Sequence, residues 1–316
     1  MKRIILFTLS LIIVVGIVTA LILNNNDKTD SDEFKIAVTT TFLYDMVQVL
    51  EDKVNYFDVE LVIPPGEDPH VYSPTASDLR TLTEAEFVIY QGLDFEGRMM
   101  ALLEHAIPVA DDLASEDLEE MEDDGELVID PHFWFSIDLY KQAMTNAMNI
   151  LAEYNPEGRA QYEENLNEYF TELDELDEYI QTELERVPSD SRILITPHDA
   201  FGYMGREYDI KVYAPQGFST ESEVSNREIS DIAQLIIENE IPAIFVETTT
   251  NPNRMERLQE IVESEGHVVE VVSGKDTALL SDSLAAVGEN GDNYIEMYKR
   301  NVDIIVEHLT KGIDDD

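Results

Sequence analysis

Three of the six histidines in this chain lie just beyond strand-like runs or in tight loops, and each directly follows a proline. They are His70 in GEDPHVYSP, His132 in DPHFW and His198 in TPHDAF. A neutral imidazole is a common metal ligand, and a proline-stiffened loop holds the ring in a fixed place. One such histidine means little, but three in equivalent positions predict a shared metal site.

The other three histidines have ordinary explanations. His105 ends an amphipathic helix, His267 opens a strand after a glycine turn, and His308 lies in the last helix, where the helix dipole favours a cation. We therefore leave them out of the predicted site.

A carboxylate would complete the site, and two candidates follow strand-like runs. Glu247 ends the run AIFVE, and Asp282 lies in LLSDSLAA after the last strand. Each also has a plain structural role, because Asp282 could cap the turn that begins at Ser283 and Glu247 could support the loop into a helix at Asn253. The spacing alone does not choose between them.

Short β-rich runs alternate with helix-like stretches in two parts of the chain, a pattern typical of parallel α/β sheets. In the first part we expect strands at 34–40, 57–64, 87–92 and 107–112, and helices at 42–50, 77–85 and 96–106. In the second part we expect strands at 192–198, 211–217, 243–249 and 267–274, and helices at 199–209, 225–240, 253–266 and 293–309. A ligand would bind at the carboxyl ends of these strands.

Helical sequence between the two parts runs from about 137 to 154, breaks at Asn155-Pro156 and resumes from 157 to 187. The second stretch has one apolar stripe on an acidic helix: Tyr162, Leu166, Tyr169, Leu173, Leu176, Ile180, Leu184 and Val187. At 1.5 Å per residue it is roughly 45 Å long, which suits a rigid spine between two lobes better than a coiled coil without a partner segment. We therefore expect an N-terminal lobe at 34–155, a connecting helix at 156–187 and a C-terminal lobe at 188–316.

The composition excludes several classes of site and partner. Cysteine is absent, which removes disulfides, thiolate ligands and a lipid-modified N-terminal cysteine. Asp and Glu number 67 against 20 Lys and Arg, a formal net charge of −47, so binding to nucleic acid is not expected. The acidity is spread along the chain and is typical of a halophilic surface that stays soluble in concentrated salt. One stretch, 113–126, is especially rich in carboxylates, and we interpret it as a solvated surface loop.

The N-terminus predicts export. Met1-Lys2-Arg3 precedes twenty uncharged residues, Ile4 to Leu23, long enough to cross a bilayer. We favour an uncleaved transmembrane anchor at 1–23 over a cleaved signal, with a polar tether at 24–33 and the remainder outside the cytoplasm.

Five motifs together resemble one known family. GEDPHVYSPTASDL, DPHFW, TPHDAFGYMGREYDI, FVETTTNP and SDSLA occur in the order and approximate spacing of the metal-binding proteins of zinc and manganese ABC importers, the cluster A-I solute-binding family. The resemblance covers about residues 34 to 312. It implies two α/β lobes joined by one long helix, with the metal in the cleft between them. It also implies the ligands His70, His132, His198 and Asp282, with Glu247 close to the metal but outside its ligand set.

The resemblance implies a receptor that captures Zn²⁺ or Mn²⁺ and delivers it to a membrane permease and its ATPase. We expect a monomer with no catalytic activity. A metal-dependent hydrolase could use the same histidines with Glu247 as general base, although no HExxH motif, nucleophile elbow or phosphate loop occurs. A surface adhesin braced by metal is the third alternative. Histidine ligation predicts that metal binding weakens below about pH 6.

Overall fold

The computed structural model describes residues 34–123, 126–220 and 224–311. The chain separates into two units, Met1–Phe34 and Lys35–Asp316, and the fold below is that of the second. The predicted anchor at 1–23 and tether at 24–33 lie outside the described residues. Among the described residues, no helix combines the length and apolar character that crossing a bilayer requires.

The first half of the fold is built on a four-stranded sheet in the order β2-β1-β3-β4, in which β3 pairs in parallel with both β1 and β4. Its elements are β1 (Phe34–Val38), α2 (Thr41–Leu50), β2 (Phe57–Leu61), α3 (Ala76–Glu84), β3 (Phe87–Tyr90) and β4 (Ile107–Pro108). Side-chain caps start both helices: the Thr40 hydroxyl accepts from the backbone N–H of Leu43, and Thr75 forms a capping box with Asp78. The alternation predicted for this half is therefore present.

Two predictions for this half are wrong. The stretch expected as a helix at 96–106 forms only a 3₁₀ turn, η1 (Gly97–Leu102). Gly97 has φ +34°, and a Cβ there would lie 2.0 Å from the carbonyl oxygen of His70, so the turn begins in a backbone shape that favours glycine. The acidic segment 113–126, expected as a loop, contributes a strand to an antiparallel hairpin, β5 (Glu120–Asp123) with β6 (Glu126–Ile129). Charge pattern alone does not reveal this backbone pairing.

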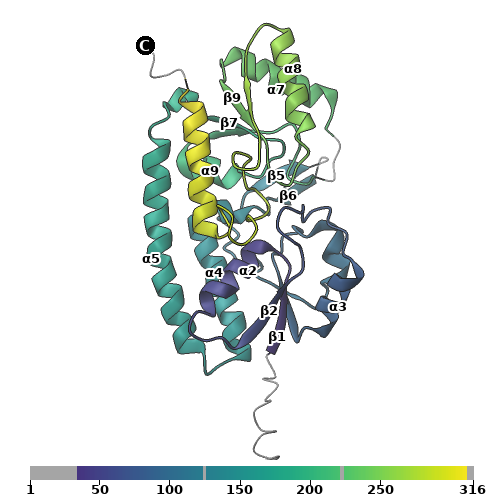
Figure 1. Cartoon of the computed structure of the whole chain (residues 1–316), viewed down its shortest axis with the longest axis vertical. Coiled ribbons are helices and arrows are strands. Elements are labelled where there is room, and N and C mark those ends of the chain that lie inside the picture. The colour runs from purple at the N-terminus through teal and green to yellow at the C-terminus, as the bar shows by residue number, and fades with distance from the viewer. Residues whose placement is uncertain (1–33, 124–125, 221–223, 312–316) are drawn as a thin grey trace, which may run out of the picture. The chain divides into compact units, whose positions relative to one another are not determined.

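Helices α4 (Ile137–Tyr154) and α5 (Arg159–Leu184) link the two halves. The stripe predicted on α5 is buried from Tyr162 to Leu184, and the helix packs against α2, α4 and α9 (Figure 1). Its partners therefore come from its own chain, which removes the coiled-coil alternative.

The second half contains two pairs of parallel strands, β7 with β8 and β9 with β10. Its elements are β7 (Ile193–Ile195), α6 (Gly202–Tyr208), β8 (Lys211–Tyr213), α7 (Asn226–Glu238), β9 (Ala243–Phe245), α8 (Asn253–Ser264), β10 (Glu270–Val272) and α9 (Tyr294–Leu309). A core that includes Ile195, Ile236, Ile244 and Met255 packs these helices on the strands. The fold is thus α/β with parallel strands in each half, as predicted.

Candidate metal centre

His70 lies in the loop after β2 and is fixed through its backbone and its ring. The Oδ1 of Asp68 accepts a hydrogen bond from the His70 N–H at 3.0 Å, and Arg98 donates its N–H to the His70 carbonyl at 3.3 Å. The ring lies edge-on to Phe95, with centroids 4.8 Å apart. The Oδ2 of Asp68 accepts from the hydroxyl of Thr220 at 2.6 Å, which ties this loop to the second half of the chain.

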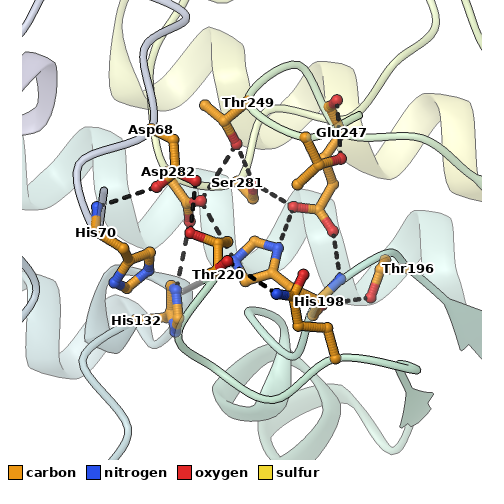
Figure 2. A network of polar contacts seen from close by, with 12 residues as sticks. Asp68, His70, His132, Thr196, His198, Thr220, Glu247, Thr249, Ser281 and Asp282 are labelled. Atoms are coloured by element: carbon orange, nitrogen blue, oxygen red, sulfur yellow. Dashed lines mark hydrogen bonds and ion pairs between the residues drawn. The ribbon is translucent and has the colours of Figure 1, made fainter. Parts of the chain in front are cut away.

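His132 follows β6 and precedes η2 (Phe133–Phe135). The Oδ1 of Asp130 accepts from the His132 N–H at 2.9 Å and lies 2.7 Å from its Nδ1. Occupying Nδ1 in this way turns Nε2 into the site (Figure 2). Trp134 closes the other side, with its ring centroid 5.2 Å from that of His132 and its Nε1 donating to the carbonyl of Ser281 at 3.0 Å.

His198 lies three residues beyond β7, where an isolated parallel bridge to Gln216 extends the β7–β8 pairing. Its Nδ1 lies 2.5 Å from the Oε2 of Glu247, whose Oε1 accepts from the His198 N–H at 3.2 Å. Ser281 donates its hydroxyl to the same Oε2 at 2.6 Å. Glu247 therefore acts on His198 as Asp130 acts on His132, by holding the ring from behind.

Asp282 supplies the carboxylate. Its Oδ1 is 3.3 Å from the Nε2 of His132, and its Oδ2 is 3.3 Å from the Nε2 of His198. The Oδ2 also accepts a hydrogen bond from the hydroxyl of Thr249 at 3.2 Å. The carboxylate thus lies among the rings, in the place that the sequence alone left open between Asp282 and Glu247 (Figure 2).

The four side chains converge on one point. One ligand atom from each of His70, His132, His198 and Asp282 lies within 4.8 Å of every other, and all four residues are buried. The Nε2 atoms of the three rings and the Oδ1 of Asp282 make no hydrogen bond to any described residue. Buried polar atoms are normally hydrogen-bonded, so four such atoms facing one another are arranged for a ligand that all of them share.

Burial and charge give the rings different protonation states. Burial lowers the pKa of His70 to about 3, so its Nε2 has a free lone pair at neutral pH. Burial also opposes the charged form of His132, but the charges of Asp130 and Asp282 outweigh it and raise the pKa of His132 to about 9. The carboxylates of Asp282 and Glu247 likewise raise the pKa of His198 against burial. The pKa of Asp282 is held well below its usual range, because the two cationic rings outweigh its own burial.

Three imidazoles and one carboxylate are a donor set for a borderline divalent cation. Zinc accepts such a set as a tetrahedron, with bonds of about 2.0–2.2 Å. Two of the rings, those of His132 and His198, are already held from behind by carboxylates, an arrangement typical of metal-ligating histidines. The site therefore offers a donor set able to hold one divalent metal ion.

Sequence reasoning missed the role of Asp130, although a signal was present. The tripeptide Asp-Pro-His occurs twice, at 68–70 and 130–132, and in both cases the carboxylate accepts from the histidine N–H. Only Asp130 also contacts its ring, whereas Asp68 contacts Thr220. The repeated tripeptide indicates the turn, but the second contact depends on the fold.

We expect Asp130→Asn to lower the affinity for a divalent metal by about 10–100-fold, because the neutral amide makes the imidazole of His132 a weaker donor. Asp68→Asn is the comparison variant, since it makes the same change in the same tripeptide without contacting a ring, and it should lower the affinity by clearly less than Asp130→Asn does. Competition with a chromophoric chelator measures both. Equal losses in the two variants would contradict the role of Asp130.

Comparisons with known proteins identify the family of the chain. The sequence model of the family described as "Zinc-uptake complex component A periplasmic" (ZnuA) matches residues 36–308. The chain belongs to this family. Among curated ZnuA-family relatives, the zinc-binding protein TroA of Treponema pallidum is 32% identical over 268 residues, covering 80% of this chain and 83% of TroA. The manganese-binding lipoprotein MntA of Bacillus subtilis is 29% identical over 289 residues, covering 89% of this chain and 92% of MntA.

Two solved TroA structures share the fold. The periplasmic zinc-binding TroA of Treponema pallidum superimposes with a TM-score of 0.80 at 28% identity, covering 88% of this chain and 99% of that one. Another TroA structure, from a study of metal-binding specificity, reaches a TM-score of 0.85 at 46% identity, with the same two coverages. The similarity therefore extends over both halves of the described chain.

Proposed function

We propose that this chain is the extracytoplasmic substrate-binding component of an ABC importer, which captures Zn²⁺ or Mn²⁺ and delivers it to a permease and its ATPase. One observation carries the proposal: four buried donor atoms without hydrogen bonds to described residues face a common point. Membership of a family described as a zinc-uptake complex component supports the transport role, and relatives named as zinc-binding or manganese-binding proteins support the choice of metal.

We assign His70, His132, His198 and Asp282 as the ligands, with Glu247 and Asp130 behind two of the rings. Two ligands then come from each side of the connecting helix. On this proposal the lobes are 34–155 and 188–316, joined by 156–187, and metal occupancy biases their relative position so that a permease can distinguish loaded from empty protein.

Zinc is the metal that this donor set favours on its own. The set fills a tetrahedron, and affinity at a mixed nitrogen and oxygen site is higher for zinc than for manganese. Manganese prefers more ligands, which a second oxygen of Asp282 could supply. The name of MntA shows that a family member can be manganese-binding.

The hydrolase alternative loses its proposed base. A metal hydrolase needs a carboxylate that is free to take a proton from bound water. The Oε2 of Glu247 lies against His198 and Ser281, and its Oε1 accepts from the His198 backbone. Asp130 is engaged with His132 in the same way. Both carboxylates behind the site thus position rings.

We further propose that residues 1–23 anchor the protein at the outer face of the membrane. Curated relatives such as MntA are named as lipoproteins. This chain has no cysteine that could carry a lipid, so we propose that the apolar segment takes the place of a lipid anchor. The 67 acidic residues against 20 basic ones suit a surface exposed to concentrated salt. A halophilic source would account for both the composition and its even spread.

Metal analysis tests the proposal directly. Protein purified without chelator should contain about one equivalent of zinc or manganese, and metal-stripped protein should rebind one equivalent in a calorimetric titration. Cells that lack the gene should take up less radioactive metal than complemented cells. A stripped protein that binds neither metal would refute the ligand assignment, and unchanged uptake would refute the transport role.

A further inference from the structure

The two oxygens of Asp282 have different surroundings. The Oδ1 is buried and makes no hydrogen bond to a described residue, whereas the Oδ2 accepts from the hydroxyl of Thr249 at 3.2 Å. The Thr249 hydroxyl lies 3.5 Å from that of Ser281, which donates to Glu247 at 2.6 Å. Thr249 therefore belongs to a chain of polar contacts that runs from Asp282 to the carboxylate behind His198 (Figure 2).

We propose that Thr249 sets whether Asp282 binds the metal through one oxygen or two, and thereby the balance between zinc and manganese. This inference rests on the proposed function. A hydroxyl that donates to a carboxylate oxygen occupies a lone pair and weakens that oxygen as a metal donor. With Oδ2 held in this way, Oδ1 and three imidazoles make four donors, the number that zinc takes as a tetrahedron.

The other neighbours of this carboxylate cannot have the same effect. The Nε2 atoms of His132 and His198 are each 3.3 Å from an Asp282 oxygen, but on the proposed ligand set they are committed to the metal once it binds. Thr249 is not among the four proposed ligands, so on this inference its hydroxyl stays on Oδ2 when the metal binds. Removing that hydroxyl frees Oδ2 as a fifth donor, which manganese tolerates better than zinc does.

The test compares three variants of the full chain. Thr249→Val removes the hydroxyl at nearly constant volume, and Thr249→Ser restores it. Thr248→Val is the matched control, because the neighbouring Thr248 hydroxyl makes no hydrogen bond to a described residue. Two readouts are used: the ratio of zinc to manganese affinity by competition, and the visible spectrum after loading with Co²⁺, which absorbs more strongly in four-coordinate than in five-coordinate sites.

We expect Thr249→Val to lower the zinc-to-manganese affinity ratio by about tenfold and to weaken the cobalt bands, while Thr249→Ser and Thr248→Val behave like the parent. An unchanged ratio and spectrum in Thr249→Val would overturn the inference. A parallel fall in both affinities with an unchanged spectrum would also overturn it, because Thr249 would then only support the fold. If the parent itself binds neither metal, the proposed function fails first.

Discussion

Replacing His198 by alanine is expected to remove the bound metal and to destabilise the metal-free protein, whereas His70→Ala removes the metal with a much smaller loss of stability. The His198 ring is fully buried between the carboxylates of Glu247 and Asp282. Truncating it leaves the buried Glu247 carboxylate without its cationic partner and Asp282 with His132 alone, which costs about 3–5 kcal/mol. His70 is neutral, because burial lowers its pKa to about 3, so its removal exposes no unpaired charge.

Metal content and chemical unfolding, measured on the two variants side by side, separate these effects. Both variants should retain less than a tenth of an equivalent of metal, compared with about one in the parent. Only His198→Ala should show a large fall in the free energy of unfolding after metal removal. Equal unfolding midpoints for the two stripped variants would show that the His198 ring does not carry the charge that we assign to it.

Removal of the metal from the parent is expected to lower its unfolding temperature substantially. A ligand at about 1,000 times its dissociation constant stabilises the native state by about 4 kcal/mol. For a unit as long as Lys35–Asp316, an unfolding entropy of about 2.1 cal/mol/K per residue makes that a shift of roughly 7 °C. Scanning calorimetry with and without a chelator measures the difference, and an unchanged unfolding temperature would contradict metal binding to the folded state.

The difference in unfolding temperature between the metal-loaded and the metal-free protein should shrink steadily as the pH falls. In the metal-free protein the pKa of His132 is raised to about 9, so the ring holds a proton at neutral pH that the metal must displace. Below pH 9, protonation of His132 therefore stabilises the metal-free protein. It does not stabilise the metal-loaded protein, in which the metal takes the place of that proton. The apparent affinity should fall by about tenfold per pH unit for each displaced proton, starting well above the pH 6 expected for an ordinary imidazole. Scans at pH 6, 7 and 8 test this slope, and equal metal-induced shifts at all three would contradict it.

The sequence indicates the three histidines because their local setting repeats: His70, His132 and His198 each follow a proline at the end of a run or turn. It does not distinguish Glu247 from Asp282, because both follow strand-like runs. The structure shows the reason: both carboxylates contact His198, one at Nδ1 and the other at Nε2. Which side of a ring a carboxylate occupies depends on packing between segments distant in the sequence. The spacing of the residues along the chain does not predict that packing.

The alternation of strands and helices is read correctly because its pattern is local and strongly periodic. The errors occur where the local secondary structure depends on backbone contacts with residues distant in the sequence. The 3₁₀ turn at Gly97–Leu102 follows from the close approach of Gly97 to the His70 carbonyl. The hairpin strand Glu120–Asp123 exists because Glu126–Ile129 pairs with it, despite a composition that favours a loop. Contacts of this kind can be predicted only once the fold is known.

Trp134 is the single tryptophan of the chain, and it touches the site from two directions. Its ring borders His132, and its indole N–H binds the carbonyl of the residue before Asp282. Near-ultraviolet emission from the unlabelled protein therefore has one dominant source, located beside the candidate metal site. Loading, competition and release kinetics can then be followed optically, without attaching a dye to either lobe.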